Sequence, residues 1–248
     1  MILASEEQIT QYRETGCWGE RTLIDDYKLY VAANPQRIAF IDPSNKQALV
    51  GMSPERVSFA VFDRAVDAVA TALRARGIGK DDIVLAQLPN IWELGMLYVA
   101  VARAGGVLSA LPMQWRSKEL LYVGGLTEAK AFITVEKFHN FDHLAMGGEV
   151  QASLPALKQL ISFPQLREMM LTEPSAKLDS IPLDANEIFT LCWTSGTEAE
   201  PKGCPLSHNN WRCLSDVAFA GGITPGATLF TAAPLTNMGG VGTVLITG

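Results

Sequence analysis

The chain of 248 residues is long enough to bury a substantial core, as one large domain or two modest ones. A hydrophobic fraction of 48% with 19% charged residues is typical of a folded globular protein and argues against disorder. The formal net charge of −6 argues against nucleic acid as a partner, because neutralising many phosphates requires a basic face.

The start of the chain and its cysteines bear on where the protein works. Residues 1–7 contain neither the basic start nor the apolar run of a secretory signal. The longest apolar stretches, such as residues 94–102, are too short to span a bilayer. The cysteines show no Cys-x-x-Cys spacing, so we expect no zinc site and no disulfide but reduced, mostly buried thiols at Cys17, Cys192, Cys204 and Cys213. These features predict a cytoplasmic protein without a membrane span.

Helix and strand patterns alternate from the N-terminus onwards. Ser5 and Gln8 have the spacing of a capping box and predict a short first helix. Residues 37–42 predict a strand that a proline closes. Residues 58–77 predict a long helix, whose apolar stripe consists of Val61, Ala65, Val69, Ala72 and Leu73.

The middle of the sequence has the pattern of a parallel sheet. Residues 83–88 form a continuous apolar run, which is typical of a strand buried on both faces. Further along we expect a helix at 92–104, a strand at 107–111, a helix at 118–126 and a strand at 131–135. This alternation implies right-handed crossovers and an α/β fold with a doubly wound parallel sheet. Ligands of such sheets bind at the carboxyl ends of the strands.

A polar, proline-containing segment at 179–187 divides the sequence into two predicted parts. Residues 1–178 are predicted to form a first α/β subdomain, and residues 179–248 the start of a second. In the second part we expect a strand at 188–193, a helix at 207–220 and a strand at 228–233. The final residues, 244–248, lie in an apolar segment whose side chains would lack partners, so we expect a truncated chain.

Residues 193–203 form a loop of small and hydroxyl residues, Trp-Thr-Ser-Gly-Thr-Glu-Ala-Glu-Pro-Lys-Gly. Gly196 permits backbone angles that turn successive N–H groups inward, which creates an anion nest. Donors suited to phosphate oxygens are the hydroxyls of Thr194, Ser195 and Thr197 and the mobile ammonium of Lys202. The segment therefore predicts a phosphate-binding loop.

Two other interpretations of residues 193–203 are disfavoured. The P-loop of kinases and GTPases has a Gly directly before its Lys and a hydroxyl residue directly after it, and Lys202 has neither. A plain surface turn is compatible with the composition, but an ungapped run of this length and order argues against it.

The order Trp193-Thr194-Ser195-Gly196-Thr197, Pro201-Lys202-Gly203 and Ser207-His208 resembles the signature of the adenylate-forming superfamily. This group comprises acyl-CoA synthetases, luciferases and the adenylation domains of peptide synthetases. Further segments resemble CoA ligases for medium-chain, alicyclic or aryl acids, and these are residues 12–18, 73–78, 88–90 and 126–130. Residues 234–240 are similar to the segment at the acyl pocket of that superfamily. The resemblance covers the whole chain, although its members are much longer.

The resemblance implies a two-step reaction that uses ATP, Mg²⁺ and coenzyme A. A carboxylic acid attacks the α-phosphorus of ATP to give acyl-AMP and pyrophosphate, and the thiol of coenzyme A then displaces AMP. This chemistry needs positioning and charge neutralisation rather than a covalent protein nucleophile. By resemblance, the phosphate site consists of Thr194, Ser195, Gly196, Thr197, Glu198 and Lys202, with Lys202 as the catalytic residue, and the acyl site of Asn237, Met238, Gly239 and Gly240.

The chain departs from the superfamily pattern at three positions. Glu198 and Ala199 stand where Thr and Gly are usual, which removes a hydroxyl donor and a flexible hinge. The carboxylate of Glu198 would repel polyphosphate unless it points outward or lies beside magnesium, and Ala199 should stiffen the loop. Asn237 replaces the usual His, which removes a titratable aromatic side chain from the predicted acyl site.

Segments that complete the site in the superfamily are not found. The sequence has no Tyr-Gly-x-Thr-Glu segment, no Gly-Asp ribose-binding element and no downstream catalytic Lys. We therefore interpret the chain as the N-terminal part of an acyl-CoA synthetase that is inactive on its own. Two alternatives stay open, namely a ligase that loads a carrier protein and a nucleotide-binding module without turnover. The sequence does not identify the carboxylic acid. It also leaves open whether the protein forms a homodimer.

Weaker patterns are interpreted as structural. His139 and His143 could approach one metal from a helix, but no third ligand fits the pattern, so we favour a solvated junction and assign no metal site. His208 is expected to cap or pack at a helix start rather than to act as a base. Residues 239–242 lack the βαβ context of a dinucleotide loop. Core or groove-wall positions are expected for Trp92, Trp115 and Trp211.

Overall fold

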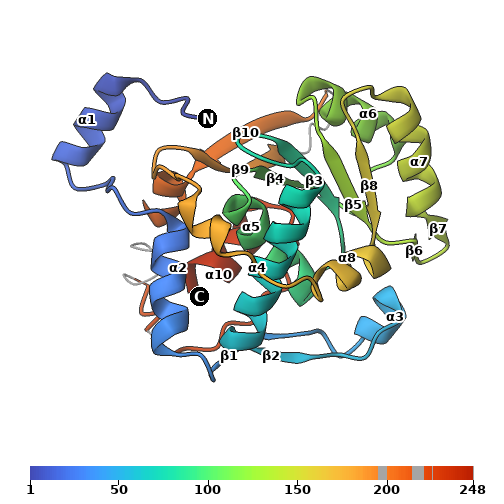
Figure 1. Ribbon diagram of the computed structural model, residues 1–248, viewed down its shortest axis with the longest axis horizontal. Helices are drawn as coiled ribbons and strands as arrows, with labels where there is room; N and C mark the ends of the chain where they lie inside the picture. Colours follow the sequence, from blue (N-terminus) through green and yellow to red (C-terminus); the bar gives the residue numbers. More distant parts are fainter. Residues whose placement is uncertain (195–199, 214–220, 225, 248) are drawn as a thin grey trace.

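The computed structural model describes residues 1–194, 200–213, 221–224 and 226–247 (Figure 1). Its helices are α1 Glu6–Glu14, α2 Leu23–Ala33, α3 Lys46–Val50, α4 Phe59–Ala75, α5 Trp92–Arg103, α6 Ser117–Leu126, α7 His143–Ser153, α8 Phe163–Met169, the 3-10 helix η1 Ala176–Ser180 and α10 Met238–Thr247. Its strands are β1 Ile38–Ile41, β2 Arg56–Ser58, β3 Ile83–Gln87, β4 Val107–Ala110, β5 Ala131–Thr134, β6 Lys137–Phe138, β7 Phe141–Asp142, β8 Gln159–Ser162, β9 Ile188–Thr194 and β10 Lys202–Ser207. Residues 208–213 are also helical.

A six-stranded sheet forms the centre of the molecule, in the order β10-β9-β4-β3-β5-β8. The strands from β9 to β8 run parallel, and β10 closes one edge as the antiparallel partner of β9. The central strands β4, β3 and β5 are almost fully buried, which explains why their sequences are mostly apolar rather than alternating, with one polar residue in each.

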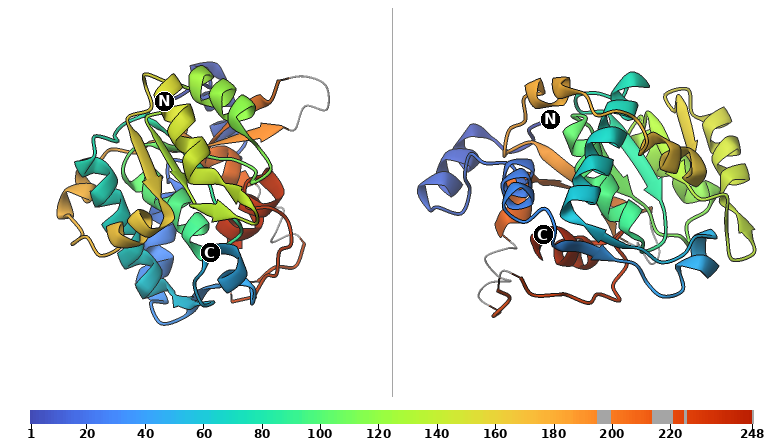
Figure 2. Two further views of the ribbon diagram at one scale, coloured as in Figure 1. Left: turned by 90° about the vertical axis from the view of Figure 1, so that its right-hand side faces the viewer. Right: turned by 60° about the horizontal axis from the view of Figure 1, so that its bottom comes forward.

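Helices cover both faces of this sheet, as Figures 1 and 2 show. On one face α4, α5 and α8 pack around Val84 and Ala86 of β3. On the other face α6 and α7 pack around Leu85 of the same strand and Phe132 of β5. Successive residues of a strand point to opposite faces, so one strand supplies both cores. The predicted α/β fold with a doubly wound, mainly parallel sheet is therefore confirmed.

One predicted strand is wrong. The described residues around 228–233 form no strand, and Phe230 within this segment is 92% exposed. The segment has the composition of a strand, but no other described strand lies beside it to pair with its backbone groups. A strand pattern becomes a strand only when a neighbour satisfies its N–H and C=O groups.

Two predictions about burial need correction. Val61, expected on the apolar stripe of α4, is 57% exposed, because α4 turns Ala65, Val66 and Val69 toward the core instead. The cysteines are free, as expected, but only Cys192 is buried, whereas Cys17 is exposed and the other two are half-buried. The expectation of mostly buried thiols is therefore wrong.

The segment predicted as a linker, 179–187, packs against the body of the protein. It overlaps η1, and Ala185 and Asn186 are buried. β9, which follows it, is the parallel neighbour of β4 in the central sheet. The sheet thus runs across the expected boundary between residues 1–178 and 179–248, and the division into two subdomains stays a prediction.

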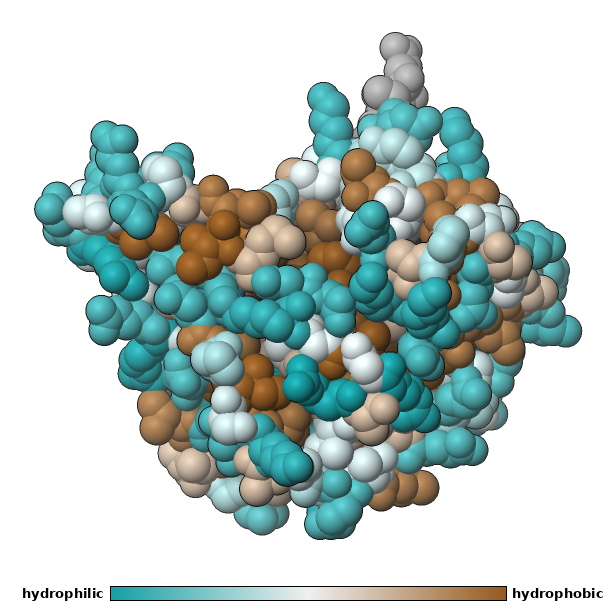
Figure 3. All heavy atoms as spheres, turned by 45° about the horizontal axis from the view of Figure 1, so that its top comes forward, coloured by the Kyte–Doolittle hydropathy of each residue, from teal (hydrophilic) through white to brown (hydrophobic). Residues whose placement is uncertain are grey.

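The N-terminal helix α1 projects from the body of the protein, and none of its residues is buried (Figure 1). The predicted capping box is confirmed, because the Gln8 amide donates to Ser5 Oγ at 3.2 Å and the Ser5 amide to Gln8 Oε1 at 3.0 Å. Figure 3 shows apolar side chains exposed between hydrophilic ones on this face of the molecule. No described helix is long and apolar enough to cross a membrane.

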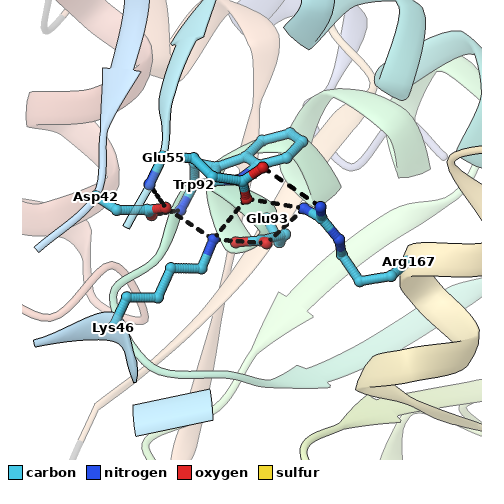
Figure 4. Close-up of polar contacts among 6 residues, drawn as sticks. All are labelled: Asp42, Lys46, Glu55, Trp92, Glu93 and Arg167. Atoms are coloured by element: carbon cyan, nitrogen blue, oxygen red, sulfur yellow. Dashed lines mark hydrogen bonds and ion pairs between the residues drawn. The ribbon is translucent and has the colours of Figure 1, made fainter. Parts of the chain in front are cut away.

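Five charged side chains meet beside the first turn of α5 (Figure 4), and we call them the buried ion cluster: Asp42, Lys46, Glu55, Glu93 and Arg167. Lys46 Nζ lies 2.7 Å from Asp42 Oδ2, 3.0 Å from Glu55 Oε2 and 2.8 Å from Glu93 Oε1. Arg167 Nη1 lies 3.0 Å from the same Glu55 and Glu93 oxygens. The cluster therefore joins α3, α5, α8 and the connection between β1 and β2.

Candidate active site

A β-hairpin frames the segment predicted to bind phosphate. β9 ends at Thr194, β10 begins at Lys202, and these two residues are partners across the antiparallel pair. Residues that pair directly in such a register lie side by side. The structure thus brings together Thr194 and Lys202. The other predicted members of the phosphate site, Ser195, Gly196, Thr197 and Glu198, lie outside the described residues, as does Ala199.

Thr194 and Lys202 are both exposed. Within the described part of the chain, the Lys202 ammonium makes no hydrogen bond and no ion pair. An ammonium without a protein partner, next to a hydroxyl, can donate hydrogen bonds to the anionic oxygens of a polyphosphate. The chemistry of these two residues therefore fits the phosphates of ATP.

Tryptophan side chains anchor this hairpin to the sheet. The Trp193 indole donates to Ser109 Oγ of β4 at 2.8 Å and packs edge-on against Trp115, with ring centroids 6.3 Å apart. The Trp211 indole donates to Thr190 Oγ1 of β9 at 2.8 Å, and Trp211 is 1% exposed. These contacts set the direction in which the hairpin leaves the carboxyl edge of the sheet. The core positions expected for Trp92 and Trp211 are confirmed.

Asn237 caps the N-terminus of α10 in the segment predicted to border an acyl group. Its side-chain oxygen accepts the N–H of Gly240 at 2.9 Å, and its carbonyl oxygen accepts the N–H of Val241 at 3.0 Å. Asn is among the favoured residues at this position of a helix. Asn237 therefore has a structural use. Of the other predicted acyl-site residues, Met238 and Gly239 are exposed and Gly240 is buried.

The 233–240 segment is attached to the carboxyl end of β3. Asn90, which follows β3, donates from Nδ2 to the carbonyl oxygen of Ala233 at 2.9 Å and accepts the N–H of Leu235 at 2.9 Å. The Tyr98 hydroxyl of α5 donates to the carbonyl oxygen of Leu235 at 2.6 Å. The segment thus lies at the edge of the sheet where ligands of doubly wound folds bind.

Substituting Gly240 with alanine is expected to destabilise the protein by about 1–3 kcal/mol, as overpacking does. A Cβ on Gly240 would lie 2.0 Å from the carbonyl oxygen of Pro234, and only a backbone shift can relieve that clash. The same substitution at Gly239 is the matched control, because its Cβ would meet nothing closer than Asn237 Oδ1 at 3.6 Å. Urea unfolding of the two variants measures the difference. Equal free energies of unfolding would contradict the close approach at Gly240.

His143 is a buried residue at the carboxyl edge whose environment the sequence did not reveal. The expected solvated junction holds for His139, which is exposed, but is wrong for His143, which is 0% exposed. His143 begins α7. Its Nδ1 lies 2.9 Å from Oε1 of Gln87, the last residue of β3. A buried residue at a loop-to-helix junction has no periodic neighbours that would predict its burial.

His208 packs at the start of the helical residues 208–213, as expected. It is 2% exposed, and its Nδ1 accepts the N–H of Leu23 at 3.2 Å. Among the residues that the structure describes, no group of three His, Cys, Asp or Glu side chains could hold a metal ion.

Similar proteins with known activities include two bacterial ligases. The chain is 27% identical over 214 residues to the medium-chain fatty-acid–CoA ligase of Escherichia coli (strain K12), which covers 83% of this chain and 36% of the ligase. It is 28% identical over 209 residues to the 2,3-dihydroxybenzoate-AMP ligase of Bacillus subtilis (strain 168), covering 83% of this chain and 37% of that protein. The chain thus spans little more than a third of the length of these relatives.

Solved structures share the fold. The apo structure of MbtA from Mycobacterium smegmatis superposes with a TM-score of 0.84 at 22% identity, over 99% of this chain and 45% of that chain. The family model described as AMP-binding enzyme matches residues 30–247, which is most of the sequence and includes both the hairpin and the 233–240 segment. The chain belongs to the family of AMP-binding enzymes.

Proposed function

We propose that the complete protein activates a carboxylic acid with ATP and transfers the acyl group to coenzyme A in the cytoplasm. The observation that carries the proposal is the hairpin that sets exposed Thr194 beside Lys202, whose ammonium has no hydrogen-bond or ion-pair partner among the described residues. Membership of the AMP-binding enzyme family supports it. Because the chain spans about a third of its relatives, the activity is proposed for the complete protein.

In the first step a carboxylate oxygen attacks the α-phosphorus of ATP, acyl-AMP forms and pyrophosphate leaves. Lys202 would offset the negative charge that develops on the departing phosphates, and Thr194 would donate a hydrogen bond to them. Donors aimed at developing charge lower the barrier more than they stabilise bound substrate. Residues 195–198 would supply further donors, and magnesium on the triphosphate would neutralise part of its charge.

In the second step the thiol sulfur of coenzyme A attacks the acyl carbon, and AMP leaves. Asn237, Met238, Gly239 and Gly240 would border the acyl group during both steps. The side-chain oxygen of Asn237 is engaged in capping α10, so we assign Asn237 to the shape of this site rather than to proton transfer.

A second candidate is an acid-adenylating ligase that passes its acyl group to a carrier protein. One relative is named as a CoA ligase and the other as an AMP ligase, at nearly equal identity, so the comparisons do not favour coenzyme A over another acceptor. A nucleotide-binding module without turnover is the third candidate.

The protein expressed from its complete reading frame should be assayed for acid-dependent exchange of pyrophosphate into ATP across a panel of carboxylic acids. Exchange with at least one acid is expected. If no acid supports exchange, the nucleotide-binding module without turnover is the candidate function that remains. Supplying coenzyme A or a phosphopantetheinylated carrier protein then identifies the acceptor. Acyl transfer to the carrier alone would overturn the CoA assignment.

Substituting Lys202 with alanine is expected to raise the KM for ATP and lower kcat/KM by about 10- to 150-fold, because a charge-assisted hydrogen bond contributes about 1.5–3 kcal/mol. The KM for the acid should change little. Lys177→Ala is the matched control, since Lys177 is also exposed and lies in η1, away from the hairpin. Equal ATP kinetics in both variants would remove Lys202 from the phosphate site.

A further inference from the structure

The turn between β3 and α5 is a rigid part of the carboxyl edge. The Trp92 amide donates to Asp42 Oδ1 at 3.0 Å, and the Trp92 indole donates to Glu55 Oε2 at 2.9 Å (Figure 4). Glu93, the next residue, is fully buried and paired with Lys46. The buried ion cluster therefore fixes the first turn of α5, directly after Asn90.

Asn90 uses both ends of its side-chain amide on one segment of backbone. The carbonyl oxygen of Ala233 accepts from Nδ2, and the N–H of Leu235 donates to Oδ1, each at 2.9 Å. A carboxamide that pairs with a C=O and an N–H two residues apart imitates a neighbouring strand. The 233–240 segment has no strand partner among the described residues, so Asn90 supplies the pairing that a strand would give.

A second hydrogen bond reaches the same point of this segment from α5. The Tyr98 hydroxyl, which is buried, donates to the carbonyl oxygen of Leu235 at 2.6 Å. Leu235 is thus held through both its N–H and its C=O, and Leu235 and Thr236 are 5% and 6% exposed. α10 begins three residues after Leu235, and Asn237 caps it.

We propose that Asn90 and Tyr98 are positioning residues that hold the 233–240 segment in place as one wall of the carboxylic acid site. This inference rests on the function proposed above. When a wall residue is not held, only a fraction of the molecules presents the competent site, and the apparent affinity for the ligand falls by that fraction. The hairpin of β9 and β10, which we propose to bind the phosphates of ATP, is anchored separately through Trp193 and Ser109. ATP binding therefore does not depend on the hydrogen bonds of Asn90 and Tyr98.

Asn90→Ala and Tyr98→Phe, made in the complete protein, test the tether. Asn90→Ala removes two hydrogen bonds, so we expect the KM for the best acid of the panel to rise about tenfold while the KM for ATP stays unchanged. Tyr98→Phe removes one hydrogen bond and should act in the same direction with a smaller rise. Asn45→Ala is the matched control, since Asn45 is exposed and its side chain makes no capping hydrogen bond.

A residue with a general structural role would lower stability without separating the two KM values. If the acid KM is unchanged in both variants, or if both KM values rise together, the inference is overturned. Asn90→Asp gives a further distinction, because it keeps the acceptor for the Leu235 N–H and loses the donor to Ala233. A carboxylate oxygen would then face the carbonyl oxygen of Ala233 and repel it, so the acid KM of Asn90→Asp should rise at least as far as that of Asn90→Ala.

Hydrogen exchange gives a readout that does not need activity. In Asn90→Ala, the Leu235 amide should exchange about tenfold faster or more, while amides of β9 keep their wild-type rates. Unchanged exchange at Leu235 would overturn the inference even if the enzyme is active. If the wild type activates no acid, the proposed function fails, and the exchange measurement still decides whether Asn90 holds the segment.

Discussion

Substituting Lys46 with methionine is expected to lower the free energy of unfolding by about 3–5 kcal/mol, which is the cost of leaving buried charges without their partner. Lys46 is fully buried, and its ammonium contacts carboxylates of Asp42, Glu55 and Glu93. Two of these, Asp42 and Glu93, have no exposed side-chain surface. In the variant, Arg167 still contacts Glu55 and Glu93, whereas Asp42 has no other ion-pair partner among the described residues.

The pKa shifts in the cluster follow from the same geometry. Burial works against the charge of Lys46, but the hydrogen bonds that its ammonium donates to Asp42 and Glu93 outweigh it and raise the Lys46 pKa. Burial raises the pKa of Glu93, and Lys46 opposes that rise. Burial would also raise the pKa of Glu55, but hydrogen bonds from Trp92, Lys46 and Arg167 lower it to about 2. Removing Lys46 therefore destabilises carboxylates that depend on it.

Lys28→Met is the matched control for Lys46→Met. Lys28 also bridges two carboxylates, at 2.7 Å from Asp63 and 2.8 Å from Asp67, but its side chain is 30% exposed. Water can solvate the charges left behind, so we expect a loss of about 1 kcal/mol or less. Urea unfolding measures both variants. The interpretation fails if Lys46→Met costs no more than Lys28→Met.

A second substitution separates lost charge balance from lost packing. Glu93→Gln in the Lys46→Met background removes one of the carboxylates that have lost Lys46, so part of the lost stability should return. Glu93 suits this test because its Oε2 has no hydrogen-bond partner among the residues that the structure describes. A double variant that is less stable than Lys46→Met would show that packing, rather than charge, dominates the loss.

The fold could be predicted because its central strands carry their own signal. A strand buried on both faces needs apolar residues at nearly every position, and residues 83–88 and 131–135 have them everywhere except at Gln87 and Thr134. The segment at 228–233 has a similar composition without being a strand. The difference lies in whether a neighbour pairs with the backbone, and local composition does not contain that information.

The phosphate hairpin could be predicted for a different reason. The order of hydroxyl residues, Gly and Lys in residues 193–203 is a local pattern, and the antiparallel register then places Thr194 beside Lys202. The tether of the 233–240 segment has no such pattern. Asn90 follows a proline and is typical of a turn, and its partners lie 143 and 145 residues further along the chain.

The buried ion cluster could not be predicted from the sequence either. Asp42, Lys46 and Glu55 stand in polar stretches between short elements, where charged residues are ordinarily exposed. Arg167 is separated from Glu55 by 112 residues. Only the packing of α3, α5 and α8 around the β1–β2 connection brings these surface-like residues together and buries the side chains of Asp42 and Lys46.

Acid is expected to destabilise the protein as the pH falls from 6.5 toward 4, through His143 and His208. Burial lowers the pKa of His143 to about 4, the charge of Arg116 adds to this, and Asp142 opposes it. Burial also lowers the pKa of His208 to about 4, against the opposing charges of Glu187, Asp25 and Asp184. Unfolded histidine titrates near 6.5.

The geometry of His143 explains why its protonation is unfavourable. Gln87 donates from Nε2 to the carbonyl oxygens of Pro112 and Trp115, at 2.8 and 3.1 Å, so its Oε1 faces His143 and must accept from Nδ1–H. The proton of an imidazolium would then sit on Nε2, which is buried and has no hydrogen-bond partner in the described part of the chain. The ring of Phe141 lies 5.0 Å from the imidazole and offers no acceptor for it.

The sign of the pH effect follows from proton linkage. Between pH 6.5 and 4 the unfolded chain binds protons that the folded histidines do not bind, so stability is full above pH 6.5 and declines below it. Each histidine contributes roughly 1 kcal/mol per pH unit in this window. Urea unfolding at several pH values between 7.5 and 5 should therefore show a steep slope. That range keeps the titration of unfolded carboxylates small.

Asparagine variants test which histidines cause this slope. Asn can imitate the Nδ1–H donor of His143 and the Nδ1 acceptor of His208 without titrating. The double variant His143→Asn/His208→Asn should lose most of the pH dependence between 6.5 and 5. His139→Asn is the matched control, because His139 is exposed and its φ of 52° is one that Asn tolerates. If the double variant keeps the wild-type slope, the surroundings of His143 and His208 do not hold these imidazoles neutral, and the interpretation is wrong.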